Sequence, residues 1–190
     1  MIETTAMPDL RPNPAILVGA GGALALASVA FLSWPVAIAS VVLGILMIAG
    51  ADVDARTYLL PDAVTFGATV AGIVVAPLID PFDPWFAGVS ATARAIGCAA
   101  VLALLRVSYA RMRGREGLGF GDVKLAAAVG AWLPLDVIPL CFGLATSAAL
   151  LSALITLLRG ETVERATRLP LGAFLCPSLW LVFYAGALVS

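Results

Sequence analysis

The chain has 190 residues, of which 62% are hydrophobic and only 12% are charged, and its mean hydropathy is +1.05. This composition excludes an ordinary water-soluble globular domain. The formal net charge of -1 and the lack of a long basic patch exclude a nucleic-acid-binding function. Because a helix needs about 20 apolar residues to cross a bilayer, we predict an all-α, polytopic integral membrane protein with about 6–7 transmembrane helices.

Apolar segments recur along the whole chain. The predicted spans, in chain order, are residues 15–32, 35–51, 64–78, 91–110, 121–133, 137–158 and 170–189. Only Ser33 and Trp34 separate the first two spans, which predicts a tight helical hairpin. We expect residues 1–190 to form a single transmembrane domain that begins with a short tail, residues 1–14.

The fifth predicted span is short, because a helix of about 13 residues extends only roughly 20 Å. A re-entrant segment is the alternative to a crossing. It would place the arginines after the sixth span on the outer face, against the tendency of basic loops to lie inside. We therefore favour a crossing that begins slightly earlier or lies in a locally thinned membrane.

Arginines cluster in two predicted loops, which places those loops on the cytoplasmic side. These arginines are Arg106, Arg111, Arg113 and Arg115 after the fourth span, and Arg159, Arg165 and Arg168 after the sixth. The tail and the loop 52–62 are then cytoplasmic too. The loops around Asp80 and Asp136 hold no basic residue and fall outside. Only Arg94, near the outer end of the fourth span, does not fit this assignment.

The residue types limit the chemistry that the chain can perform. Histidine is absent, which excludes Ser-His and Cys-His nucleophile pairs and HExxH zinc sites. Cys98, Cys141 and Cys176 lie singly in apolar stretches and form no CxxC pair. We expect no metal and no cofactor, so any hydrolysis must depend on carboxylates, lysine or hydroxyl groups.

Aspartates lie at the inner ends of two predicted spans. Asp52 and Asp54 follow the second span, and Asp122 begins the fifth. A carboxylate at the edge of hydrocarbon is costly to ionise, so each is a functional candidate. Two aspartates from different helices could share a proton and act as one base and one acid. Such a pair can activate water for attack on a peptide carbonyl.

Two motifs surround these aspartates. The first is DARTYLLPD, in which Pro61 follows Asp54 by seven residues, and the second is GLGFGDVKL, which contains Asp122. Together they resemble the two motifs of the type IV prepilin peptidases, which are GxGD intramembrane aspartyl proteases. The late segment RLPLGAFLCPSLW is similar to a family stretch before the last helix. The resemblance covers roughly residues 48–180.

The resemblance implies a role for each matching residue. Asp54 and Asp122 would be the catalytic aspartates, and Gly119 and Gly121 the motif glycines. The supporting or substrate-binding positions would be Pro61, Asp62 and Lys124, with Arg56 as a further candidate. The glycines would also let an extended substrate lie against the backbone.

The resemblance also implies an aspartic endopeptidase of the bacterial cytoplasmic membrane. It would remove the basic leader from type IV prepilins, or from pilin-like components of secretion, competence or adhesion systems, at the cytoplasmic boundary. Its partners would be this substrate, with its hydrophobic helix, and membrane lipid. Longer relatives that also methylate the product carry paired CxxC motifs, which this sequence lacks, so we expect a short form without methyltransferase activity.

Several alternatives stay open from the sequence. Asp52 rivals Asp54, although its distance to Pro61 is two residues too long. Asp62 and Asp122 could each cap a helix. Lys124 could favour ionisation of Asp122 or be an interfacial lysine.

Arg56 could pair with Asp54 or Asp62, or only mark the cytoplasmic side. A small proton- or cation-coupled transporter subunit that uses the same aspartates is the alternative function. A non-catalytic membrane scaffold is the second alternative.

Overall fold

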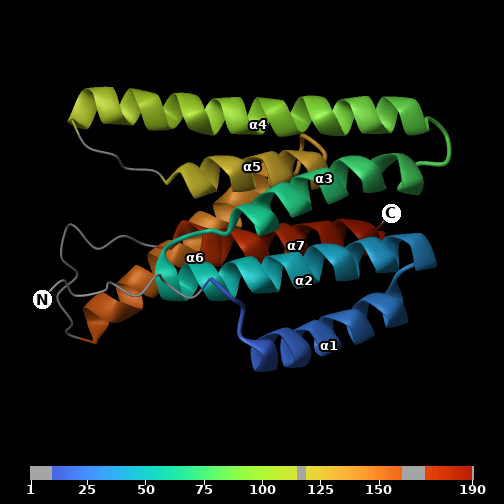
Figure 1. The fold of residues 1–190 in the computed structure, drawn as a ribbon, viewed down its shortest axis with the longest axis horizontal. Coiled ribbons are helices and arrows are strands. Elements are labelled where there is room, and N and C mark those ends of the chain that lie inside the picture. The colour runs from blue at the N-terminus through green and yellow to red at the C-terminus, as the bar shows by residue number, and fades with distance from the viewer. Residues whose placement is uncertain (1–9, 115–118, 160–169, 190) are drawn as a thin grey trace, which may run out of the picture.

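The computed structural model describes residues 10–114, 119–159 and 170–189, and this part of the chain forms seven α-helices and no strand. The helices are α1 (Pro14–Phe31), α2 (Trp34–Thr57), α3 (Asp62–Ile79), α4 (Pro84–Arg113), α5 (Phe120–Trp132), α6 (Ile138–Leu158) and α7 (Leu171–Val189). They lie side by side and run alternately in opposite directions (Figure 1). The predicted all-α fold is confirmed.

Six of these helices are long and apolar enough to cross a membrane, and α5 is the exception. The chain is therefore a multi-pass membrane protein. At 13 residues, α5 reaches only partway through a hydrocarbon layer of roughly 30 Å. Helix α6 runs in the opposite direction to α5, so α6 finishes at the end of the bundle where α5 begins (Figure 1). Arg159 directly follows α6 and therefore lies at that end. Arg115, Arg165 and Arg168 fall outside the described residues.

Helices α2 and α4 extend further than hydropathy predicts. Helix α2 continues past the predicted end at residue 51 to Thr57, so the predicted loop 52–62 is mostly helical. Asp52, Asp54 and Arg56 are polar but compatible with a helix, and the turn begins only at Tyr58, whose φ is 55°. Helix α4 begins at Pro84 because the Asp83 side chain accepts the backbone N–H of Phe86 at 3.0 Å.

Helix α5 forms much of the interior although it is the shortest helix. It packs against α3, α4 and α7, and most of its residues are buried. Leu125 and Val129 are fully buried, while its alanines and Gly130 allow neighbouring helices to approach closely. The Trp132 indole donates to the backbone oxygen of Ala68 at 2.7 Å, which joins the end of α5 to α3.

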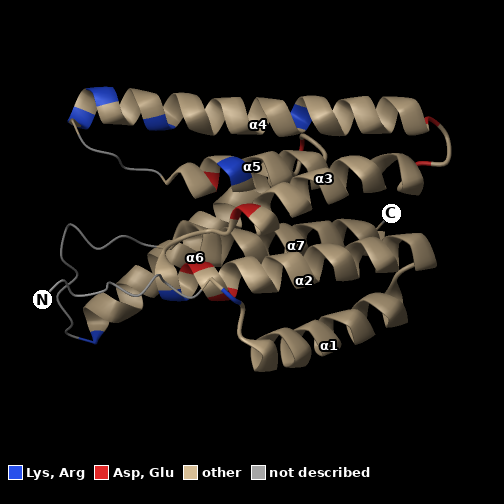
Figure 2. Ribbon diagram, in the orientation of Figure 1, with Lys and Arg blue, Asp and Glu red and all other residues tan. Residues whose placement is uncertain are grey.

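Charged residues are concentrated at one end of the bundle, where α2 ends and α3 and α5 begin (Figure 2). In the turn between α3 and α4, at the opposite end, both charged residues are acidic, Asp80 and Asp83. Arg94 lies between these ends, within α4. The candidate site residues therefore share one end of the molecule.

Replacement of Gly130 by alanine should destabilise the fold. A Cβ there would overlap the backbone of Arg94 in α4, which cannot move without shifting the helix. Overpacking of this kind typically costs about 1–3 kcal/mol. We expect a lower apparent Tm for Gly130→Ala in detergent. Gly97→Ala is the matched control, because a Cβ at Gly97 meets nothing within 4 Å; equal Tm values for the two variants would contradict this packing.

Candidate active site

Asp54 lies in the last turn of α2 and is buried, with 6% of its surface exposed. Its Oδ2 atom accepts the backbone N–H of Ala173 at 2.8 Å. Ala173 belongs to the first turn of α7, where N–H groups have no partner within the helix. The end of α2 and the beginning of α7 are thus joined through this carboxylate.

Gly172 is a site residue that the sequence analysis did not single out. A Cβ on Gly172 would lie 2.8 Å from Asp54 Oδ2 and 2.9 Å from Leu60 Cδ1. No larger residue fits there without displacing the carboxylate. The signal was present in the RLPLGAFLCPSLW segment, whose resemblance we noted without assigning its glycine a role.

Asp122 lies in the first turn of α5 and is partly exposed. Its Oδ2 atom accepts the backbone N–H of Gly119, the residue before the helix, at 3.2 Å. Gly119 is the N-cap of α5, and Asp122, the third helical residue, takes part in the capping by accepting the Gly119 N–H, as in a capping box. The contact uses one lone pair of the carboxylate, which has two oxygens and about four lone-pair sites. Asp122 can therefore have a structural role and a chemical role together.

The structure brings Asp54 and Asp122 to the same site from two different helices. They are close enough to interact electrostatically, and both lie within electrostatic range of the buried Cys176 side chain. Leu60 helps to set the approach of α5. A Cβ on Gly121 would lie 3.1 Å from the Leu60 Cβ, so the GxGD segment packs directly on the residues that precede Pro61.

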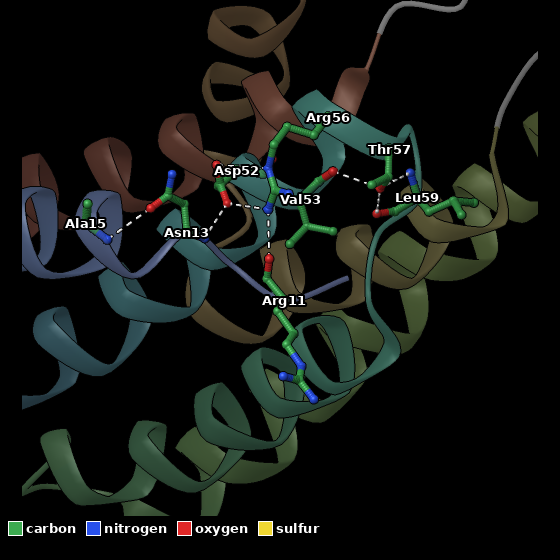
Figure 3. Close-up of polar contacts among 8 residues, drawn as sticks. All are labelled: Arg11, Asn13, Ala15, Asp52, Val53, Arg56, Thr57 and Leu59. Carbon is green, nitrogen blue, oxygen red and sulfur yellow. Dashed lines mark hydrogen bonds and ion pairs between the residues drawn. The ribbon is translucent and has the colours of Figure 1, made fainter. Parts of the chain in front are cut away.

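Asp52, the rival of Asp54, points to a different side of α2 because residues two apart on a helix do not share a face. Its Oδ2 accepts Arg56 Nη2 at 2.7 Å and the backbone N–H of Asn13 at 2.8 Å (Figure 3). Arg56 also donates to the backbone oxygen of Arg11 at 2.8 Å. The sequence left open whether Arg56 pairs with Asp54 or Asp62, and in the structure it pairs with Asp52 because the i,i+4 spacing favours that contact.

Lys124 pairs with Asp62, at 2.6 Å between Nζ and Oδ1. The rings of Phe66 and Phe120 lie 5.4 Å and 4.9 Å from the ammonium group, within range of cation–π attraction. We call this ion pair between α3 and α5 the Asp62–Lys124 clamp. The structure gives Lys124 a partner on α3 rather than Asp122, which lies two residues away on the same helix.

Pro61, not Asp62, occupies the capping position of α3. It adopts an extended conformation, and Asp62 is the first helical residue. The capping interpretation of Asp62 is therefore wrong, and its carboxylate serves the clamp instead. Pro61 lies between Leu60, which packs against Gly121, and Asp62 of the clamp. Because proline fixes its own φ angle, it restricts the backbone between these two contacts.

This arrangement suits acid–base chemistry by a pair of carboxylates. Two coupled carboxylates can hold one proton between them, so that one acts as base and the other as acid. In the part of the chain that the structure describes, no group of three metal-ligating side chains is gathered. One of the two aspartates is buried and the other is partly exposed, so the pair can be reached from the Asp122 side.

Comparisons with known proteins identify relatives of this chain. The model of the type IV leader peptidase family matches residues 41–157, which include both aspartates. The chain is 31% identical over 150 residues to a prepilin leader peptidase/N-methyltransferase of Xanthomonas campestris, covering 77% of this chain and 50% of that protein. It is 31% identical over 133 residues to the leader peptidase HopD of Escherichia coli, covering 68% of this chain and 81% of that protein.

A prepilin leader peptidase/N-methyltransferase of Neisseria gonorrhoeae is 30% identical over 154 residues. The chain spans about half the length of the relatives with that double name, as the 50% coverage of the Xanthomonas and Neisseria proteins illustrates. No solved structure matches the chain significantly. The family match covers more than half of the chain and contains both motifs, and we conclude that this chain belongs to the type IV leader peptidase family.

Proposed function

We propose that the chain is a membrane aspartic endopeptidase that removes the basic leader from type IV prepilins or pilin-like proteins. The observation that carries this proposal is the convergence of Asp54 and Asp122 at one site from two helices. Family membership supports the same reaction class. We assign Asp54 and Asp122 as the catalytic pair and Asp52 to the attachment of the N-terminal segment.

The reaction needs one ionised and one protonated carboxylate. The ionised member takes a proton from water as the water attacks the scissile carbonyl. The protonated member donates to the developing oxyanion, and a proton then passes to the leaving amine. This sequence needs no nucleophilic side chain, which agrees with a chain that contains no histidine.

The substrate has an open approach on the Asp122 side. Gly119 and Phe120 are exposed beside Asp122, and Tyr58 and Leu59 are exposed after α2. An extended peptide can lie along these two segments, while its hydrophobic helix stays in lipid. Glycine at position 119 keeps the backbone accessible next to the carboxylate.

We further propose that the charged end of the bundle faces the cytoplasm of a bacterial cell. The C-terminal ends of α4 and α6 lie at the same end of the bundle as the aspartate pair (Figure 2). They carry or precede Arg106, Arg111, Arg113 and Arg159, and basic residues favour the cytoplasmic side. Cleavage would then occur at the cytoplasmic boundary of the membrane. Supporting roles fall to Gly119, Gly121, Pro61 and the Asp62–Lys124 clamp.

Asparagine replacements test the catalytic pair. We expect Asp54→Asn and Asp122→Asn each to reduce cleavage of a basic-leader prepilin by at least about 10²–10⁴-fold, because neither amide can exchange the proton. Cleavage by purified protein in liposomes is the measurement. Asp52→Asn is the matched control on the same helix and should keep most of the activity.

Full activity in either asparagine variant would remove that aspartate from the pair. If the wild type cuts no basic-leader substrate while aspartate-dependent proton or cation flux is measured in the same liposomes, the transporter interpretation replaces the peptidase. A non-catalytic scaffold predicts that both asparagine variants function as the wild type does.

A single methyl group at position 172 should abolish most of the activity. We expect Gly172→Ala to displace the Asp54 carboxylate from Ala173, because the new Cβ would lie 2.8 Å from Oδ2. Displacing a reacting group by an ångström can cost about 10²-fold in rate. Gly186→Ala, also on α7, is the control because nothing lies within 4 Å of its Cβ. Equal cleavage rates for the two variants would show that this contact does not position Asp54.

The Asp62–Lys124 clamp should act on the rate rather than on substrate affinity. We expect Lys124→Gln to lower kcat by about two- to fivefold, since exposed ion pairs contribute at most about 1 kcal/mol and the Asp62 side chain is 66% exposed. The reversed pair, Asp62→Lys with Lys124→Asp, should recover part of the loss with KM little changed. An additive loss in the reversed pair would show that the two residues act independently.

A further inference from the structure

Arg94 is a charged residue within a membrane-spanning helix, and such a residue calls for a partner. Its side chain is half-buried and bends back one turn, where Nη1 donates to Ser90 Oγ at 3.0 Å. Its Nε donates to the backbone oxygen of Gly130 at 3.2 Å. The guanidinium thus points towards the beginning of α4, the end of the bundle that carries Asp80.

The contact with Gly130 has a local cause. The N–H that would satisfy this carbonyl belongs to the residue four positions later, which is Pro134 and has no N–H. Arg94 Nε supplies the missing donor. This explains the position of Arg94 but not its charge, because the contact uses one of five N–H groups and a neutral donor could make it.

No acidic residue in the described part of the chain forms an ion pair with Arg94. The Asp80 carboxylate accepts the backbone N–H groups of Phe82 and Asp83 through Oδ1, at 2.9 Å and 3.2 Å. Asp80 and Arg94 nevertheless line one cavity. The cavity has a volume of about 540 Å³ and lies where α5 has ended, between α3, α4 and α7.

The rest of this cavity is mostly apolar. Val75 and Ile79 of α3, Trp132 of α5 and Phe183 of α7 form its walls, and Trp132 and Phe183 pack edge to face. Apolar walls at membrane depth favour hydrocarbon over water. A cation, a carboxylate and hydrocarbon-like walls therefore lie together, and the ligand must match all three.

We propose that this cavity binds a phospholipid with an amine in its headgroup, of the phosphatidylethanolamine class. Arg94 holds the phosphate, Asp80 pairs with the ammonium, and an acyl chain lies along Val75 and Phe183. A guanidinium is well suited to phosphate because its N–H groups form paired hydrogen bonds. The lipid fills the space that the short α5 leaves. The inference does not depend on the proposed peptidase activity.

The test measures lipid retained by the purified full-length chain. Delipidated protein is incubated with phosphatidylethanolamine, phosphatidylglycerol or inorganic phosphate, and bound ligand is measured by native mass spectrometry. We expect Arg94→Gln to reduce phosphatidylethanolamine binding about tenfold, because it removes the charge but keeps an N–H donor for Gly130. Arg111→Gln, which removes a charge at the opposite end of α4, is the control and should bind as the wild type does.

Two further variants keep the inference testable if Arg94→Gln fails to fold. Val75→Trp fills the cavity wall without changing Arg94 and should reduce binding to a similar extent. Asp80→Asn should shift the preference from phosphatidylethanolamine towards phosphatidylglycerol. Unchanged phosphatidylethanolamine binding in Val75→Trp, or in folded Arg94→Gln, would overturn the proposal. Competition by inorganic phosphate as strong as that by the lipid would overturn it too, because the site would then bind free phosphate.

Discussion

The hydrogen bond from the Ala173 N–H to Asp54 joins residues 119 positions apart in the sequence, and the geometry of the site depends on it. It attaches the end of α2 to the beginning of α7. A helix begins with N–H groups that have no partner within the helix, and a nearby carboxylate satisfies them while interacting favourably with the positive end of the helix dipole. Asp122 makes the same kind of contact with the Gly119 N–H at the beginning of α5.

Two helix N-termini therefore meet at the two aspartates. Leu60 lies between them and contacts the positions of both Gly121 and Gly172. Because neither glycine can accept a Cβ without moving its neighbours, the distance between the helices is set by the lack of side chains at these positions. The site depends on close backbone packing as much as on the two carboxylates.

Much of the fold was predictable from the sequence because hydropathy identifies membrane helices directly. The seven segments were found, but the ends of α2 and α4 were not. Hydropathy marks the edge of the apolar stretch, whereas a helix ends where the backbone turns, as at Tyr58. The polar last turn of α2 was therefore mistaken for a loop, although it carries Asp52, Asp54 and Arg56.

The partners of charged residues were predicted less well than their positions. The pairing of Arg56 with Asp52 was readable from the sequence, because residues four apart share a helix face. The pairing of Lys124 with Asp62 was not, since it depends on how α5 packs against α3. Lys124 and Asp122 are two residues apart on one helix, and this spacing alone places their side chains on different faces.

Arg94 was noticed as an exception to the basic-loop pattern, and its explanation lies elsewhere in the chain. Pro134 leaves a carbonyl of α5 without its helical donor, and the bilayer supplies no water to replace it. Arg94 of α4 donates to this carbonyl in place of the missing helical donor. The spacing of four residues between Gly130 and Pro134 was visible in the sequence, but the identity of the donor was not.

The short length of α5 connects the two ends of the molecule. Beginning at the charged end, α5 presents Asp122 to Asp54, and ending early, it leaves the cavity lined by Arg94 and Trp132. A full-length α5 would fill that space with its own side chains and would need no external donor for Gly130. The Asp62–Lys124 clamp joins the beginning of α5 to α3, and the contact between Arg94 and Gly130 joins the end of α5 to α4. A ligand in the cavity therefore contacts the end of α5, the same helix that carries Asp122.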